Sequence, residues 1–432
     1  MILQSAEKKM GFEKQDMKLF LSSGRTRGGP GDFFISAVVG TISSLPVFLI
    51  GTLAIQIRAS LHFGSSTLGI VVAAYYLGAA VSSLPGSHLS ERIGGIRVMK
   101  IGILLLIVLL VILDLAADSV AVLISIMALA GLVSGILQPA LNLFLSKRIT
   151  PESQGLAFGI KQAAIPLASS LGGIAVPLIA LTIGWRQVFV IAAVCAVIIY
   201  LLIPKPRYNL SDSKSGVLAD ADIKIPRAAL TILAVAIAFG MISASGLTSF
   251  LVTFAVHDHI GKGTSGWIAG IGSGLTVLVR IGVGIFADKK PRRHFITIAT
   301  MLFIGAFGYI FLFLGASQSN ETLIIIGTLI ALGIGWGWNG LFNYSVVRSC
   351  VDAPARATGI TQIGGRLGAV IGPLAVGLII KDSSFEIAWL FCGISMVLGA
   401  VTMLIGRRLL INYGIDSDNY SAAALIASAS AG

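Results

Sequence analysis

Twelve apolar segments of about 20 residues or more determine what this chain of 432 residues can fold into. A helix rises about 1.5 Å per residue, so each segment can cross the hydrocarbon core of a bilayer, which is about 30 Å thick. Because lipid offers no partners to backbone amides and carbonyls, spans of this length are helices. The sequence therefore predicts an all-α membrane protein with twelve transmembrane helices, near residues 33–57, 67–86, 96–116, 119–146, 155–181, 185–203, 228–256, 266–287, 295–315, 321–347, 357–380 and 386–405.

The composition agrees with a membrane protein of many spans. Hydrophobic residues make up 56% of the chain and charged residues only 12%, and the mean hydropathy of +0.93 lies well above that of a soluble globular domain. Three polar segments remain: a tail at residues 1–32, a proline-containing linker at 204–227 and a tail at 406–432. They predict two bundles of six helices, at residues 33–203 and 228–405.

The distribution of lysine and arginine predicts the orientation. With the N-terminus in the cytoplasm, three of the 31 basic residues lie within spans and four lie outside, which leaves 24 on the cytoplasmic side. The four outside are Arg58, Arg186, Lys262 and Lys381. Since positively charged loops remain cytoplasmic, both termini are expected there. The net charge of +12 then follows from topology and does not indicate a nucleic-acid partner.

The second half of the chain repeats the first. At a shift of 200 residues, ten positions between 157 and 179 are identical to the corresponding positions between 357 and 379. Both segments start on the predicted cytoplasmic side, so the two halves have the same orientation. Parallel six-helix halves are one of the recognised architectures of transporters.

Lys161, Arg280 and Arg366 are cations inside spans, and no carboxylate lies at a comparable depth in another span. A charged side chain near the bilayer centre costs about 2.5 to 3.5 kcal/mol on insertion scales, so each of the three needs a cavity, a partner or a ligand. A negatively charged substrate would meet that need. The sequence thus predicts a site for a small anion.

Arg280 precedes Asp288 by eight residues and so lies about 12 Å inside the predicted cytoplasmic boundary. Ser273 and Thr276 share its helix face, which we expect to look into a central cavity. The paired N–H donors of an arginine match the two oxygens of a carboxylate. Arg280 is therefore a candidate for substrate binding, with a structural ion pair as the alternative.

Arg366 follows Arg356 by ten residues, about 15 Å, and so lies near the midplane, with Gln362 one turn earlier on its face. Pro166 occupies the corresponding place in the first half, which makes the arginine an addition to a symmetric frame. We expect Arg366 to contact substrate; the alternative is a packing role through backbone carbonyls. Lys161 lies about six residues into its span, and it either binds substrate or extends toward the cytoplasmic water.

Neutral polar and aromatic side chains complete the predicted site. Two pairs of amides are each spaced four residues apart, so each pair shares a helix face. Two adjacent tyrosines in the second span can form an aromatic wall, although packing between helices explains such residues as well. These residues are Gln138, Asn142, Asn339, Asn343, Tyr75 and Tyr76.

A further repeat lies in the loops after the second and eighth spans. At a shift of 197 residues, Ser87–Gly94 (SHLSERIG) corresponds to Gly284–Pro291 (GIFADKKP), which is followed by two arginines. The pattern resembles the G-x-L-A-D-R-x-G-R-R loop of the major facilitator superfamily, and the resemblance covers about residues 33–405. It implies two pseudo-symmetric six-helix bundles that rock around a midplane substrate site, without a cofactor.

The same loops predict a gate. An acid at a helix end beside several bases can form charge-assisted hydrogen bonds with neighbouring helix ends, and this latch must break when the halves rock. In the first copy, Ser87 and Glu91 replace the glycine and aspartate of the family, so we expect the amino-terminal latch to pack less tightly. The bases can instead be simple positive-inside anchors. The predicted gate residues are Glu91, Arg92, Arg97, Asp288, Arg292 and Arg293.

Other classes of function lack their parts. The chain has no nucleophile elbow, no H-E-x-x-H pair and no phosphate loop, so we do not expect an enzyme. His257 and His259 are two residues apart and do not share a helix face, so no metal site is predicted. Drug exporters of the superfamily commonly carry a membrane acid in the first helix and an arginine in the fourth, and this chain has neither.

We therefore expect a monomeric secondary transporter of a bacterial cytoplasmic (inner) membrane that moves a small organic anion, a mono- or dicarboxylate, by proton symport or anion exchange. The resemblance supports a carboxylate, since monocarboxylate and oxalate-type members also place a cation in the eighth helix. The main alternative is an exporter of drug-like or amphipathic compounds. A remote alternative is a ligand sensor that does not transport.

Overall fold

The computed structural model describes residues 30–146, 154–204, 225–289, 294–350 and 353–414. Every regular element in these ranges is helical. The amino-terminal half contains α2 (Pro30–Thr52), α3 (Ala54–Leu61), α4 (Ser65–Ile93), α5 (Gly95–Ala116), α6 (Val120–Ser146), α7 (Gln154–Ala175), the π-helix η2 (Val176–Ala180) and α8 (Trp185–Leu202). The carboxy-terminal half contains α9 (Arg227–His257), α10 (Lys262–Lys289), α11 (Phe295–Gln318), α12 (Glu321–Thr328), the π-helix η4 (Leu329–Ile334), α13 (Asn339–Ser349), α14 (Pro354–Asp382) and α15 (Phe385–Asn412).

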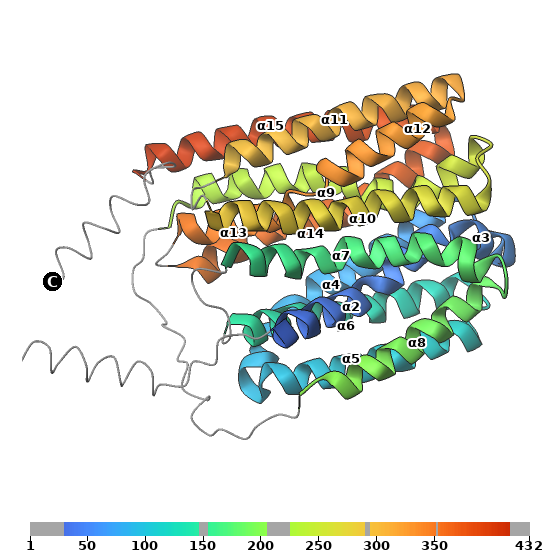
Figure 1. Cartoon of the computed structure of the whole chain (residues 1–432), viewed down its shortest axis with the longest axis horizontal. Helices are drawn as coiled ribbons and strands as arrows, with labels where there is room; N and C mark the ends of the chain where they lie inside the picture. The colour runs from blue at the N-terminus through green and yellow to red at the C-terminus, as the bar shows by residue number, and fades with distance from the viewer. Residues whose placement is uncertain (1–29, 147–153, 205–224, 290–293, 351–352, 415–432) are drawn as a thin grey trace, which may run out of the picture.

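Twelve spans within the described ranges are long and apolar enough to cross a membrane. This result confirms the predicted all-α membrane fold. The spans lie side by side along one long axis of the molecule (Figure 1). We call the end at which α2 begins and α8 ends the linker end, and the opposite end the far end.

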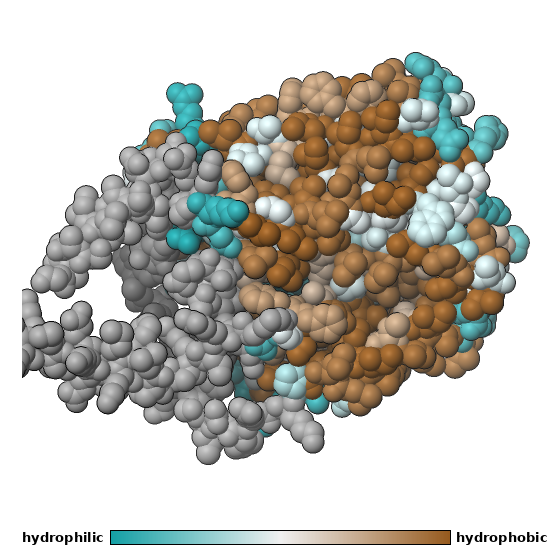
Figure 2. Space-filling view, in the orientation of Figure 1, coloured by the Kyte–Doolittle hydropathy of each residue, from teal (hydrophilic) through white to brown (hydrophobic). Residues whose placement is uncertain are grey.

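Large hydrophobic side chains cover the sides of the bundle. Figure 2 shows a broad hydrophobic belt, with hydrophilic residues gathered at the far end, at the right of the view. Leu104, Leu278 and Leu398 are among the exposed hydrophobic side chains, and they belong to three different helices. A continuous apolar surface of this extent matches a lipid environment.

Two spans are interrupted where the hydropathy predicted one continuous helix. The first span breaks at Leu53 (φ −90°, ψ 8°) and continues as α3 to Leu61, four residues beyond the predicted end at 57. The tenth span passes from α12 through η4 and a turn at residues 335–338 before α13 begins. Hydropathy averages the apolar character of a segment, so a broken helix and a continuous one of the same composition have the same profile.

The last helix extends beyond its predicted end. α15 continues to Asn412, whereas the apolar pattern predicted an end at residue 405 and a tail from 406. The added turns carry Arg407 and Arg408, whose long side chains can reach water from a helix that projects past the hydrocarbon. A helix therefore does not have to stop where its apolar segment stops.

Glycines bring helices within each half into backbone contact. A Cβ atom at Gly131 of α6 would collide with the carbonyl oxygen of Tyr75 in α4. A Cβ atom at Gly364 of α14 would likewise collide with the carbonyl oxygen of Ala234 in α9. Small residues permit such close approach between membrane helices, where packing replaces the hydrophobic effect as the driving force.

The two halves also meet backbone to backbone. Gly173 of α7 faces the backbone of Gly270 in α10, and Gly69 of α4 faces the carbonyl of Pro373 in α14. At the first of these contacts, the Ser170 hydroxyl donates to the Gly270 carbonyl at 2.7 Å. Because main chains approach each other across this interface, carbonyl groups of one half are within reach of side chains of the other.

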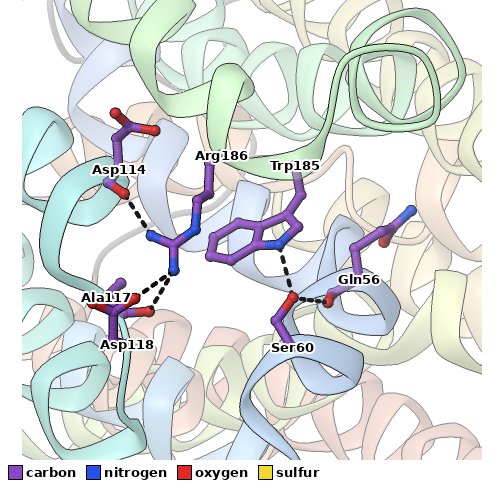
Figure 3. A network of polar contacts seen from close by, with 7 residues as sticks. All are labelled: Gln56, Ser60, Asp114, Ala117, Asp118, Trp185 and Arg186. Carbon is purple, nitrogen blue, oxygen red and sulfur yellow. Dashed lines mark hydrogen bonds and ion pairs between the residues drawn. The ribbon is translucent and has the colours of Figure 1, made fainter.

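Arg186 ties the loops of the amino-terminal half together at the far end (Figure 3). Its guanidinium donates to the carbonyl of Asp114 at 2.5 Å, to the carbonyl of Ala117 at 3.3 Å and to the Asp118 carboxylate at 2.7 Å. These carbonyls end α5, where the negative pole of a helix dipole favours a cation. The neighbouring Trp185 donates from its indole nitrogen to the Ser60 hydroxyl of α3 at 3.0 Å. Arg186, which the sequence places on the outer side, thus has a structural role.

Two glycines of α14 offer a matched test of the close contact between α9 and α14. We expect Gly364→Ala to lower the melting temperature of the purified protein, because the added methyl group meets the backbone of Ala234 and overpacking costs about 1 to 3 kcal/mol. Gly359 of the same helix has no atom within 4 Å of an added Cβ. Gly359→Ala should therefore leave the melting temperature unchanged or raise it slightly, and equal losses in both variants would contradict the contact.

Candidate functional site

Arg280 is buried between the two halves. Only 1% of its surface is exposed. Its Nε and Nη2 donate to the carbonyl of Trp336 at 3.3 and 2.9 Å, and its Nη1 donates to the carbonyl of Gln162. The guanidinium also lies over the Trp336 indole, 4.9 Å from the ring centroid, and Phe48 of α2 packs on that ring at 5.9 Å. Backbone dipoles and an aromatic face therefore balance this charge.

The contacts of Arg280 join the halves of the protein. Gln162 belongs to α7 in the amino-terminal half, while Trp336 lies in the turn that interrupts the tenth span of the carboxy-terminal half. Arginine suits this role because its planar guanidinium can donate hydrogen bonds to acceptors on two sides at once. The sequence offered an ion pair as the alternative to substrate binding, but the observed partners are carbonyls.

The polar face that Arg280 shares with Ser273 and Thr276 packs against neighbouring helices. The Ser273 and Ser169 hydroxyls are hydrogen bonded at 2.8 Å across the interface between α10 and α7. Thr276 donates to the carbonyl of Leu332 at 2.8 Å, within η4. All three side chains are at most 1% exposed. We expected this face to look into a central cavity; in the structure each of its polar groups has a protein partner instead.

Arg366 lies at the middle of the bundle and also contacts the opposite half. Its Nη1 donates to the carbonyl of Ala79 at 2.6 Å. Ala79 lies 14 residues from each end of α4 (Ser65 and Ile93), so the contact lies at the middle of that helix. The arginine is only half-buried. A single carbonyl therefore balances part of its charge, and this contact is of the kind that the sequence offered as the alternative to substrate binding, packing through a backbone carbonyl.

Lys161 is the third cation of the spans. It lies on α7, is half-buried, and has no hydrogen-bond partner among the described residues. The sequence left open whether Lys161 binds substrate or extends toward the cytoplasmic water, and this choice stays a prediction. Arg366 on α14 is the other half-buried cation of the three.

Carboxylates are absent from the middle of the described helices. Each acidic residue that belongs to a helix lies within two residues of an end of that helix, and these residues are Asp32, Glu91, Asp114, Asp288, Glu321, Asp382 and Glu386. No acid in the described part of the spans can neutralise Lys161 and Arg366 at their depth. Lys161 and Arg366 belong to opposite halves, on α7 and α14.

Two of the predicted amides meet beside Arg366. Gln362 lies one turn before the arginine and donates from Nε2 to Oδ1 of Asn343 at 2.6 Å. Asn339, one turn before Asn343, donates to the sulfur of Met241 at 3.7 Å. The first bond links α14 to α13, so these polar groups form part of the same region of the carboxy-terminal half.

The remaining predicted residues have different surroundings. Tyr75 is buried and donates to the carbonyl of Ser43 at 2.7 Å, while Tyr76 packs edge-on against it with ring centroids 5.5 Å apart. Gln138 is half-buried and Asn142 is exposed, both on α6. Tyr75 thus holds α4 against α2, and the structure does not bring Gln138 or Asn142 into a hydrogen bond with the cations.

Three backbone carbonyls contact the arginines, and the sequence identified none of them, although it offered packing through backbone carbonyls as the alternative for Arg366. They belong to Ala79, Gln162 and Trp336, and each accepts a hydrogen bond from an arginine. Every residue has a carbonyl, so no pattern of residue types shows which carbonyls accept a hydrogen bond from an arginine. The repeat did single out Gln162 through its match with Gln362, but only for its side chain.

One predicted gate residue forms a contact between the halves at the linker end. Oδ2 of Asp288, on α10, accepts a hydrogen bond from the backbone N–H of Leu156 at 2.7 Å. Leu156 lies in the first turn of α7, where the positive pole of the helix dipole favours a carboxylate. Arg292 and Arg293 lie outside the described residues.

The repeat-related copy of this contact is not formed. The shift of 200 residues makes Arg356 the counterpart of Leu156, and the shift of 197 makes Glu91 the counterpart of Asp288. Glu91 is exposed and has no partner among the described residues. Arg92 and Arg97 are exposed beside it. The two halves are therefore joined by an aspartate latch on one side of the repeat and not on the other.

Hydrogen exchange tests this asymmetry directly. We expect Asp288→Asn to speed the exchange of the amides at residues 154–160 about fivefold, because loss of a capping interaction costs about 1 kcal/mol. Mass spectrometry of the peptide that covers this first part of α7 measures the change. Glu91→Gln is the matched control and should leave the exchange of residues 354–360 unaltered. Equal effects in the two variants would show that the latch is not asymmetric.

Comparisons with known proteins agree with the fold. The chain matches the Major Facilitator Superfamily over residues 33–353. It is 25% identical over 355 residues to YycB, an uncharacterized transporter of Bacillus subtilis, covering 77% of this chain and 82% of the relative.

Two further relatives are named for anions. "Probable anion transporter 3, chloroplastic" of Arabidopsis thaliana is 29% identical over 140 residues, which cover 32% of this chain and 27% of the relative. "Vesicular glutamate transporter 2.1" of Danio rerio is 25% identical over 394 residues, which cover 81% of this chain and 65% of the relative. With twelve membrane-spanning helices and a family match over well more than half of its length, the chain belongs to the major facilitator superfamily of transporters.

Proposed function

We propose that this transporter moves a small organic anion, a carboxylate, by alternating access, and that Lys161 and Arg366 bind it. The observation that carries the proposal is the pair itself. Lys161 on α7 and Arg366 on α14 are half-buried cations from opposite halves, and the described part of the spans holds no carboxylate at their depth. A bound anion would reduce the cost of holding these charges away from water.

The chemistry of the two side chains favours a carboxylate. The guanidinium of Arg366 donates from Nη1 to the carbonyl of Ala79, and it has further N–H groups that can donate to a second acceptor. A carboxylate can accept two of them while its charge also attracts the ammonium of Lys161. The bonded amides of Gln362 and Asn343 lie one turn away and supply neutral donors and acceptors for other substrate groups.

The placement of the two cations on different halves supports alternating access. An anion held by α7 of one half and α14 of the other is released most easily when the halves move apart at one end. Arg280 and the Asp288 latch hold the halves together through bonds to Gln162 and Leu156. In this proposal Arg280 stabilises the closed interface, and Lys161 with Arg366 binds the substrate.

The proposal includes an orientation. Among the described residues, basic side chains that the sequence assigned to the cytoplasm stand at helix ends of the linker end, and we infer that this end faces the cytoplasm of a bacterium. They include Arg92, Arg97, Arg227 and Lys289. The names of two relatives, an anion transporter and a vesicular glutamate transporter, agree with an anionic substrate. Their identity to this chain is low, so the argument for a carboxylate depends on the cations.

Neutral substitutions at the pair test the proposal. We expect Arg366→Gln and Lys161→Gln each to weaken lactate or oxalate binding about 10- to 100-fold, because a hydrogen bond to a charged group contributes about 1.5 to 3 kcal/mol. Binding to the purified protein is measured by thermal shift, and uptake is measured in proteoliposomes. Arg408→Gln, on an exposed position of α15, is the control for the loss of a positive charge.

Two results would overturn the proposal. One is unchanged carboxylate uptake in both the Arg366 and the Lys161 variants. The other is a substrate panel in which lipophilic cations, and not carboxylates, stabilise the wild-type protein.

A further inference from the structure

Hydrogen bonds between the two halves are confined to part of the bundle. In the described ranges they join α7 to α10 and α4 to α14. The bonded residues are Leu156 with Asp288, Gln162 with Arg280, Ser169 with Ser273, Ser170 with Gly270, and Ala79 with Arg366. Closer to the far end, α2 and α3 pack against α9 of the opposite half, and no hydrogen bond of the described residues joins these elements. The closure between α3 and α9 therefore depends on packing alone.

α3 and α9 approach each other just beyond the break in the first span. An added Cβ atom at Gly51 of α2 would lie 2.9 Å from the carbonyl oxygen of Thr248 and 3.1 Å from the Cα atom of Ser249, both on α9. The chain runs toward the far end in both elements, so Gln56 of α3 and Thr253 of α9 lie about one turn further along. Both residues thus belong to the segments that meet at the far end.

These two side chains have polar atoms that are buried without a partner. The amide nitrogen and the amide oxygen of Gln56 are enclosed, and neither forms a hydrogen bond. The hydroxyl of Thr253 is likewise enclosed and unpaired, and only 8% of that residue is exposed. Closure at the far end removes these groups from water and gives them no hydrogen bond in return. A water molecule enclosed with them would have to be ordered at each closure.

α3 is fastened to its own half. The indole nitrogen of Trp185 on α8 donates to the Ser60 hydroxyl at 3.0 Å, and that hydroxyl donates to the backbone carbonyl of Gln56 at 3.2 Å (Figure 3). Nε of Arg58 donates to the carbonyl of Phe63 at 3.0 Å, in the turn that leads to α4. α3 therefore stays with the amino-terminal half when the halves separate. Its separation from α9 breaks no hydrogen bond and gives water access to the unpaired groups.

We propose that the far end is the end that opens when the transporter carries no substrate, because its closure buries polar groups that only water can pair. The linker end has the opposite balance, since separation of α7 from α10 there breaks the bonds of Leu156 and Gln162 to the other half. Opening at the far end restores hydration at no cost in hydrogen bonds. The inference concerns the empty protein and does not rest on the identity of the substrate.

Distances between spin labels on the purified full-length chain, without substrate, test the inference. Ala59→Cys on α3 with Lys262→Cys on α10 reports the far end. His88→Cys on α4 with Ala228→Cys on α9 reports the linker end. All four positions are exposed, and Cys195→Ser removes the exposed native thiol. We expect a long-distance population for the far-end pair and one short distance for the linker-end pair. The reverse result overturns the inference.

Two substitutions test the physical cause. Thr253→Val and Gln56→Met nearly preserve side-chain volume and remove the polar atoms that lack partners. We expect each to lower the ratio of open to closed molecules at the far end about fivefold or more, the effect of relieving one unpaired buried group.

Thr328→Val is the matched control. The Thr328 hydroxyl is also fully buried and unpaired, but it lies on α12, which packs inside the carboxy-terminal half. This variant should keep the wild-type ratio. An unchanged ratio in both Thr253→Val and Gln56→Met, or an equal decrease in Thr328→Val, overturns the inference. The measurements use no substrate, so failure of the carboxylate proposal leaves their outcome unaffected.

Discussion

The cost of holding positive charge among apolar helices constrains this structure most. Three cations lie inside the spans, while the acids of the described helices lie within two residues of helix ends. Two carbonyls and an indole face stabilise the charge of Arg280, and one carbonyl stabilises part of the charge of Arg366. Lys161 has no such partner in the described residues. The difference between satisfied and unsatisfied cations separates the interface that holds the halves together from the site that we propose for the substrate.

Because the main chains of the helices pack closely, backbone carbonyls lie within hydrogen-bond distance of the buried arginines. Gly159 lies against the carbonyl of Arg280, and glycines such as Gly173 and Gly69 bring the main chains of the two halves into contact. The break in the tenth span places the Trp336 carbonyl beside α10. The internal repeat supplies a symmetric frame, and several polar groups depart from it: the aspartate latch is formed in one copy, and Lys161 and Arg366 have the neutral counterparts Thr361 and Pro166. Symmetry therefore describes the scaffold, and its exceptions mark the site.

The sequence predicted the twelve spans, because apolar length and helical rise depend on local chemistry. It did not predict the breaks at Leu53 and at residues 335–338, since a broken apolar helix keeps its hydropathy. The partners of Arg280 were also out of reach, because the acceptors are backbone carbonyls of distant residues.

The location of a bound carboxylate tests the account most directly. Anomalous diffraction from crystals grown with a brominated monocarboxylate would fix the position of the ligand. The account predicts a bromine peak between α7 and α14, with the carboxylate within hydrogen-bond distance of Lys161 Nζ and the Arg366 guanidinium, and with Arg280 still bound to the carbonyls of Gln162 and Trp336. A carboxylate bound to Arg280 in place of those carbonyls, or bound away from all three cations, would contradict it.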